Sequence, residues 1–162
     1  MGHALKITLA VALLVLAAPA VLAEDKPDAR ASAKIQGCVK SAKDLQAGAE
    51  RCIGIVSNPC LDDDTTRSTA DMNACVDRER LVWDDILNET YRRLREKLDE
   101  QQQEKLRDMQ RAWIDARDKS CTFYWDYFQG TMASPMSASC INRETARRAL
   151  FLLGFLNDAE GK

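Results

Sequence analysis

The most constraining feature of the sequence is a long stretch between Pro59 and Gly130 that contains neither glycine nor proline. Within it, charged and apolar residues alternate at the spacing of an amphipathic helix. One straight helix of this length would extend for about 100 Å at ~1.5 Å per residue, too long for a compact small domain. We therefore expect two arms that fold back at Asp99 to Gln103 and set their apolar stripes face to face as an antiparallel hairpin. The stripe of the first arm comprises Met72, Val76, Trp83, Leu87, Tyr91, Leu94 and Leu98, and that of the second comprises Leu106, Met109, Trp113, Ala116, Ser120, Tyr124 and Phe128.

A further helical pattern precedes this stretch. Apolar residues recur at spacings of three and four from Ala33 to Val56, which predicts a helix that ends at Asn58-Pro59. A polar connection from Leu61 to Thr66 follows. Ser68, with Asp71 three residues later, then predicts the N-cap of the first arm and an acid in its first turn.

The chain after the second arm predicts one more helix. Gly130 ends the arm, a loop containing Pro135 continues to Ser139, and apolar residues at helical spacing predict a helix from Cys140 to Leu156. No segment has the pattern of a strand. The predicted fold is therefore all-α: a small disulfide-bonded bundle of about four helices with a central antiparallel hairpin.

The first residues, Met1 to Ala23, are typical of a cleavable signal peptide. Lys6 precedes an apolar stretch from Ile7 to Ala18, and small residues stand at the expected cleavage site. The apolar stretch is shorter than the roughly 20 residues of a spanning helix. We expect a periplasmic or secreted protein with no membrane span after cleavage, a flexible leader over residues 24–32, and a single helical domain over residues 33–160.

Six cysteines follow the predicted cleavage site, and an even number in an exported chain indicates a disulfide framework. Cys121 and Cys140 lie on either side of the predicted 130–139 loop, so they are the favoured pair. Cys38 and Cys52 would be about 21 Å apart on one continuous helix and could not pair there. Cys52 and Cys75 flank the acidic connection and could meet across it by the same reasoning. The pairing among Cys38, Cys52, Cys60 and Cys75 stays open.

Composition argues against several functional classes. Removal of Lys6 leaves 22 of the 23 basic residues against 25 acidic ones, a net charge of −3, which does not favour nucleic-acid binding. The single histidine, His3, lies in the predicted signal peptide, and no two cysteines have Cys-x-x-Cys spacing, so we expect no metal and no cofactor. No nucleophile motif or phosphate-binding glycine loop indicates an enzyme.

Several motifs carry a family resemblance. The first arm contains Asp84-x-x-Leu87-Asn88-x-x-Tyr91, and the second contains Gln110-x-x-Trp113-x-x-x-Arg117-Asp118-x-x-Cys121. Cys60 and Cys75 precede these motifs, and Cys140 and Thr145-x-x-Arg148 follow them. In this order, over about residues 60–153, they resemble the N-terminal domain of the bacterial family named for the lysozyme inhibitor LprI. The resemblance implies a helical, disulfide-bonded domain of the bacterial envelope and an inhibitor of lysozyme or a related peptidoglycan hydrolase.

The motif residues have a structural interpretation, which we favour. Arg117 would pair with an acid such as Asp84 across the hairpin, Asn88 and Gln110 would bind neighbouring polar groups, and Trp113 and Tyr91 would fill the core. Contact with a protein partner such as lysozyme is then expected elsewhere, through an acidic connection that attracts a basic enzyme and a loop that blocks its cleft. The alternative is a periplasmic interaction or envelope-stability module without lysozyme inhibition. The candidate contact residues are Gln129, Thr131, Met132, Ser134 and Met136 in the loop, and Asp62, Asp63 and Asp64 in the connection.

Overall fold

The computed structural model describes residues 26–45 and 48–161, and within these ranges it contains helices and no strand. The predicted all-α class is confirmed, with five α-helices where about four were expected. The predicted signal peptide, residues 1–23, and the first two leader residues lie outside the described part. The elements are α1 (Ala29–Ser41), the 3-10 turn η1 (Glu50–Cys52), α2 (Ser57–Leu61), α3 (Thr69–Lys97), α4 (Glu100–Phe128) and α5 (Ala133–Glu160).

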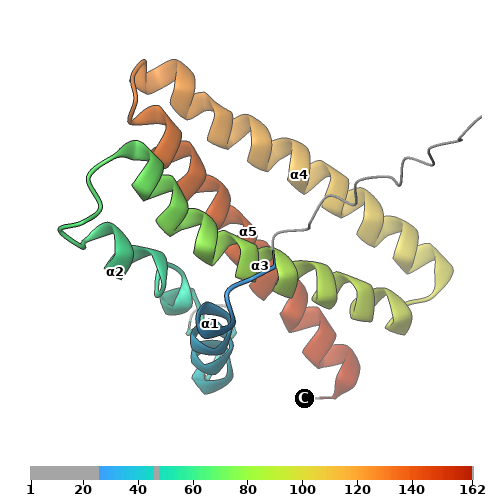
Figure 1. The fold of residues 1–162 in the computed structure, drawn as a ribbon. Helices are drawn as coiled ribbons and strands as arrows, with labels where there is room; N and C mark the ends of the chain where they lie inside the picture. Colours follow the sequence, from blue (N-terminus) through green and yellow to red (C-terminus); the bar gives the residue numbers. More distant parts are fainter. Residues whose placement is uncertain (1–25, 46–47, 162) are drawn as a thin grey trace, which may run out of the picture.

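The two arms of the predicted hairpin are α3 and α4 (Figure 1). Ser68 caps α3 and forms a reciprocal capping box with Asp71, as the sequence predicts. Asp99 does the same for α4, because its carboxylate accepts a hydrogen bond from the backbone N–H of Gln102 at 2.8 Å. The bend falls between Lys97 and Glu100, at the beginning of the predicted polar segment. The Asp99 cap therefore marks the place where the long helical stretch folds back.

The arms do not lie face to face. Helix α5 packs extensively along α3 and, over a shorter length, against α4, whereas α3 and α4 have no extensive contact with each other. Figure 1 shows α5 returning from the end of α4 and crossing α3. The expectation of direct packing between the two stripes is wrong because the more apolar α5 packs against both arms. The second stripe is only partly covered: Leu106 is buried, but Ala116, Ser120 and Phe128 are exposed.

The core lies where α1, α3 and α5 meet. Trp83 of α3, Leu152 and Leu156 of α5, and Ile35 of α1 are almost fully removed from solvent. Each of these side chains belongs to one continuous apolar cluster. Because burial of large apolar side chains is the main favourable term in folding, this junction holds the bundle together.

Two expectations for the N-terminal region are wrong. Helix α1 begins at Ala29, capped by the Asp28 carboxylate, so residues 29–32 are helical and Ala31 is part of the core. The helix expected from Ala33 to Val56 ends at Ser41. A long connection, the turn η1 and a bend at Gly54, whose φ is +89°, follow instead. A residue with a Cβ adopts that φ only with strain, so Gly54 allows the chain to bend where the sequence pattern predicts a helix.

Three disulfides join the elements. Cys121–Cys140 confirms the favoured pair, with a Cα–Cα distance of 5.4 Å. Cys38 pairs with Cys52 at a Cα–Cα distance of 5.8 Å, a pairing that a continuous helix would forbid. It forms because the chain reverses after Ser41 and brings η1 back against α1. The remaining pair is Cys60–Cys75.

Two prolines that were expected at the end of a helix or in a loop lie inside helices. Asn58-Pro59 was expected to end a helix, but it lies within the short helix α2. Pro135 was expected in a loop up to Ser139, but α5 already begins at Ala133. Both prolines occupy the first helical turn, where the missing N–H would have no helical partner. The connection from α4 to α5 is therefore only Gln129 to Met132.

Candidate functional site

The C-terminal part of α4 carries an unusual group of exposed aromatic side chains. We call Phe123, Tyr124, Trp125, Tyr127 and Phe128 the aromatic end of α4. Phe123, Trp125 and Tyr127 are 60%, 51% and 69% exposed. A helix buries one stripe against its neighbour, so five aromatic residues among six successive positions cannot all reach the core. Exposed apolar surface of this extent is typical of a binding site.

The rings of the aromatic end contact one another. Tyr124 and Phe128 lie nearly parallel, with centroids 5.7 Å apart and an interplanar angle of 14°. Tyr127 meets Phe128 edge to face at 5.0 Å, and Phe123 lies 6.1 Å from Tyr127. These contacts hold the side chains in a defined arrangement. Of this group, only Tyr124 and Phe128 belong to the apolar stripe that the sequence predicts.

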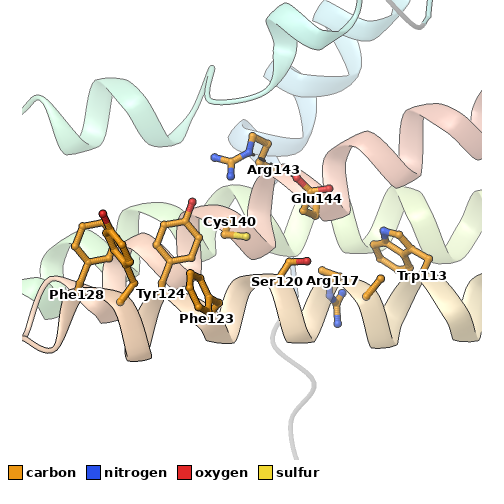
Figure 2. A pocket seen from close by; sticks show the side chains of 11 residues that line it. Trp113, Arg117, Ser120, Phe123, Tyr124, Phe128, Cys140, Arg143 and Glu144 are labelled. Atoms are coloured by element: carbon orange, nitrogen blue, oxygen red, sulfur yellow. Dashed lines mark ion pairs between the residues drawn. The ribbon is translucent and has the colours of Figure 1, made fainter.

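A groove of about 660 Å³ runs beside these rings, between α4 and α5 (Figure 2). Trp113 and Arg117 lie at one end, and Tyr124 and Phe128 lie at the other. Between them the small side chain of Ser120 leaves space open, as does that of Ala116. The opposite wall comes from α5, and the Cys121–Cys140 disulfide joins the two walls. On the α5 side, the groove is lined by Cys140, Arg143 and Glu144.

The expected pairing of Arg117 with Asp84 is wrong. The Arg117 guanidinium lies 2.8 Å from the carboxylate of the adjacent Asp118 and 4.9 Å from the Trp113 ring centroid. It also donates to the hydroxyl of Thr145 at 3.5 Å. Asp84, on α3, accepts a hydrogen bond from Asn88 instead. The two arms do not meet along their stripes, so Arg117 reaches α5 and not α3.

Arg148 has a central structural role among the motif residues. Its guanidinium lies over both the Trp113 ring at 5.5 Å and the Phe151 ring at 5.0 Å, and it donates to the side-chain oxygen of Gln110. Burial lowers the pKa of this guanidinium from its ordinary value. The contacts tie α4 to α5, which supports a structural interpretation of Gln110 and Trp113. Leu87 is buried, and Tyr91 packs against the core.

Glu79 is a fully buried carboxylate on α3 that the sequence did not indicate as a site residue. It accepts hydrogen bonds from the backbone N–H groups of Gly54, Val56 and Ser57 at 2.6, 2.9 and 2.8 Å. The side chains of Trp83 and Asn142 also donate to it, at 3.1 and 3.2 Å. Burial alone would raise its pKa, but these donors outweigh burial and lower it. No local pattern distinguishes Glu79 from the solvated acids around it.

The predicted partner segments lie at one end of the bundle. The 129–132 turn precedes α5, the acidic connection precedes α3, and Figure 1 shows both on the same side. Asn73, near the beginning of α3, donates a 2.7 Å hydrogen bond to Ser134, near the beginning of α5. Asp62, Asp63 and Asp64 are exposed, as are Gln129, Thr131 and Met132, whereas Ser134 and Met136 are half-buried on α5.

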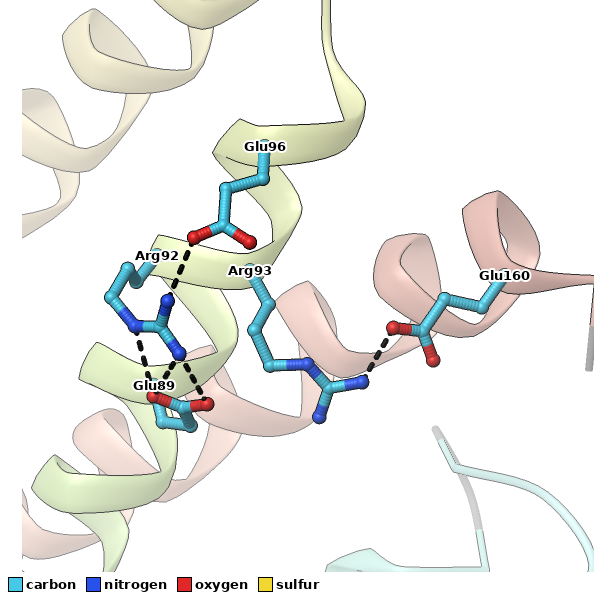
Figure 3. A network of polar contacts seen from close by, with 5 residues as sticks. All are labelled: Glu89, Arg92, Arg93, Glu96 and Glu160. Carbon is cyan, nitrogen blue, oxygen red and sulfur yellow. Dashed lines mark hydrogen bonds and ion pairs between the residues drawn. The ribbon is translucent and has the colours of Figure 1, made fainter.

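The charged residues near the end of α3 are already paired (Figure 3). Arg92 bridges Glu89 and Glu96 along the exposed surface of α3, and Arg93 reaches Glu160 of α5. These contacts are typical of a solvated helix surface. Over residues 26–45 and 48–161 no group of acidic, cysteine or histidine side chains is arranged to hold a metal ion, and no helix has the length and apolar character of a membrane span.

Comparison with known proteins identifies one family. The family model described as lysozyme inhibitor LprI matches residues 60–152, which is more than half of the chain. The match covers α3, α4 and most of α5, together with α2 from Cys60, and thus includes the aromatic end of α4 and the groove. No curated protein and no solved structure matches the chain significantly.

Proposed function

Since this chain belongs to the lysozyme inhibitor LprI family, we propose that it acts outside the cytoplasm by binding and inhibiting lysozyme or a related peptidoglycan hydrolase. The family match over residues 60–152 is the observation that carries this proposal. The three disulfides support the location, because such bonds persist in oxidising compartments. An N-terminal signal peptide, as the sequence predicts, would deliver the chain there.

The aromatic end of α4 is the contact surface that we propose. Aromatic residues are enriched in the centres of protein interfaces, where they supply most of the binding energy. Trp125 and Phe123 project from a helix, so they are presented with little conformational freedom to lose on binding. Met132, 47% exposed in the adjacent turn, adds an adaptable apolar side chain beside the rings.

The acidic connection supports attraction of a basic enzyme. Hydrogen bonds from the Thr65 hydroxyl and backbone N–H lower the pKa of Asp63, so this carboxylate stays charged well into the acidic range. Asp62 and Asp64 are exposed beside it. Complementary charge of this kind accelerates association more than it tightens the complex. We therefore expect the association rate with a basic lysozyme to fall as salt is added.

The proposal is tested with the mature, oxidised protein and lysozymes of several types. Calorimetry in the absence of glycan measures direct binding of the protein to lysozyme. The rate at which lysozyme hydrolyses a soluble oligosaccharide, present in large excess over the protein, measures inhibition. We expect Trp125→Ala to weaken both by about tenfold. Phe155→Ala is the matched control, because Phe155 is 50% exposed on α5, well away from the aromatic end, and should change neither.

Two results would count against these claims. If wild-type protein binds lysozyme and the Trp125 and Phe155 variants behave alike, the contact surface is wrong. If no lysozyme binds, the chain is not an inhibitor, and a periplasmic interaction or envelope-stability role becomes the better interpretation.

A further inference from the structure

The groove between α4 and α5 combines two kinds of surface that a single ligand would have to match. Aromatic rings occupy its ends, with Trp113 at one and Tyr124 with Phe128 at the other. Hydroxyl and charged groups lie between them, from Ser120 on α4 and from the α5 side. A ligand therefore needs flat apolar faces together with hydrogen-bonding groups around their edges.

Two common kinds of peptide ligand fit this groove poorly. An amphipathic helix requires a continuous apolar surface, but Arg117, Arg143 and Glu144 interrupt it. An extended peptide requires free backbone groups with which to pair, yet both walls are helices whose internal N–H and C=O groups are already bonded along the helix. Recognition here must come from side chains alone.

We propose that this groove binds a chain of amino sugars of the cell-wall glycan type. A pyranose ring with equatorial substituents has two C–H faces that stack on aromatic rings, and its hydroxyl and acetamido groups lie at the edge. Tyr124 and Phe128 offer two nearly parallel rings, 5.7 Å apart, a spacing close to the length of one sugar in an extended chain.

The charged groups that line the groove indicate a ligand that carries carboxylates. Arg117 and Arg143 line the groove on opposite walls, with Glu144 beside Arg143. Arginine binds carboxylates through a planar pair of N–H donors. Asp118 holds Arg117, whereas Arg143 lies 3.7 Å from Glu144, a looser contact that leaves its N–H groups available. An acidic glycan, which carries carboxylates on alternate sugars, should therefore bind more tightly than a neutral one.

The walls of the groove are held in place before any ligand arrives. The Cys121–Cys140 disulfide joins α4 to α5 beside Ser120, and Arg148 ties the helices together at the Trp113 end. A preformed site loses less conformational entropy on binding. Binding of a glycan in this groove does not depend on the binding of lysozyme.

The three tryptophans allow the site to be located in one experiment. Trp113 lines the groove, Trp125 is exposed outside it, and Trp83 is fully buried. In an NMR titration with a neutral N-acetylglucosamine tetramer or a soluble acidic muramic-acid-containing fragment, we expect the indole signal of Trp113 to shift while the other two stay in place. A shift of Trp125 alone, or no shift with either sugar, would overturn the proposal.

Variants then test the chemistry of the groove. Tyr124→Ala should weaken binding of both sugars by roughly tenfold, and Phe155→Ala, its matched control outside the groove, should leave binding unchanged. Ser120→Leu should block the groove without disturbing the core, because Ser120 is exposed. Arg143→Gln should remove the preference for the acidic fragment while binding of the neutral tetramer persists. Equal affinity of wild-type protein for both sugars would contradict the role given to Arg143.

Discussion

The carboxylate of Glu79 on α3 accepts a hydrogen bond from the backbone N–H of Ser57 at 2.8 Å and thereby caps the first turn of α2. The backbone N–H groups of Val56 and Gly54 donate to the same carboxylate. One buried side chain therefore accepts hydrogen bonds from three backbone N–H groups of this bend. No side chain of the bend itself caps α2. The N-terminal segment is therefore fastened to the bundle by an acid that lies more than twenty residues further along the chain.

Replacement of Glu79 should lower the free energy of unfolding. Glu79→Gln keeps the shape but removes the charge and turns an amide group toward N–H donors, and we expect a loss of about 3 kcal/mol in the free energy of unfolding. Urea unfolding followed by tryptophan fluorescence measures this loss. Glu89→Gln, which removes an exposed ion pair with Arg92, is the control and should cost under about 0.5 kcal/mol. Similar losses in the two variants would contradict the role of Glu79.

The same carboxylate predicts how stability depends on pH. Its pKa is lower in the folded protein than in the unfolded chain, so its contribution is complete above the ordinary glutamate pKa of about 4.3 and is lost as the pH falls through the lower folded value. We expect the free energy of unfolding to decline below about pH 5. The decline should be shallower in Glu79→Gln, and a residual slope should remain from Asp63 and Asp71, whose pKa values are also lowered by hydrogen bonds. Parallel pH profiles for the two proteins would rule out this origin.

The Cys38–Cys52 disulfide should stabilise the N-terminal segment specifically. It closes a loop with a sequence separation of 14, for which chain entropy predicts about 3 kcal/mol. We expect Cys38→Ser with Cys52→Ser to lower stability by that order and to accelerate hydrogen exchange in α1. Exchange in α4 should stay slow, because Cys121–Cys140 is intact. Unchanged exchange in α1 would show that the core contacts of Ile35 alone hold this helix.

The contacts of Arg148 predict that lysine is a poor substitute. Lysine keeps the charge but loses the planar group that lies over both Trp113 and Phe151, and it loses the geometry of the bond to Gln110. We expect Arg148→Lys to cost about 1 to 2 kcal/mol in thermal or urea unfolding. Arg95→Lys is the matched control, since Arg95 is exposed over a single ring, that of Tyr91. An equal cost in both variants would remove the special role of Arg148.

Local patterns in the sequence were sufficient to predict part of this structure. The stretch without glycine and proline, with the Ser68 cap at its beginning and the polar segment Asp99 to Gln103 in its middle, predicted two long helices and the place where the chain turns. Those signals act within a few residues, so they can be read without knowledge of the fold. The Cys121–Cys140 pair was also predictable, because a short connection forces its flanking helices together.

Tertiary structure alone decided the rest. Helical spacing shows which surface of a helix is apolar but not what covers it, so only the position of α5 shows that Phe128 and Ser120 stay exposed and that Arg117 cannot reach Asp84. The pairing of Cys38 with Cys52 depends on a chain reversal after Ser41. Glu79 is distinguished from its neighbouring acids only by the N–H groups that surround it. Each of these outcomes depends on contacts between residues far apart in the chain, and such contacts leave no periodic signal in the sequence.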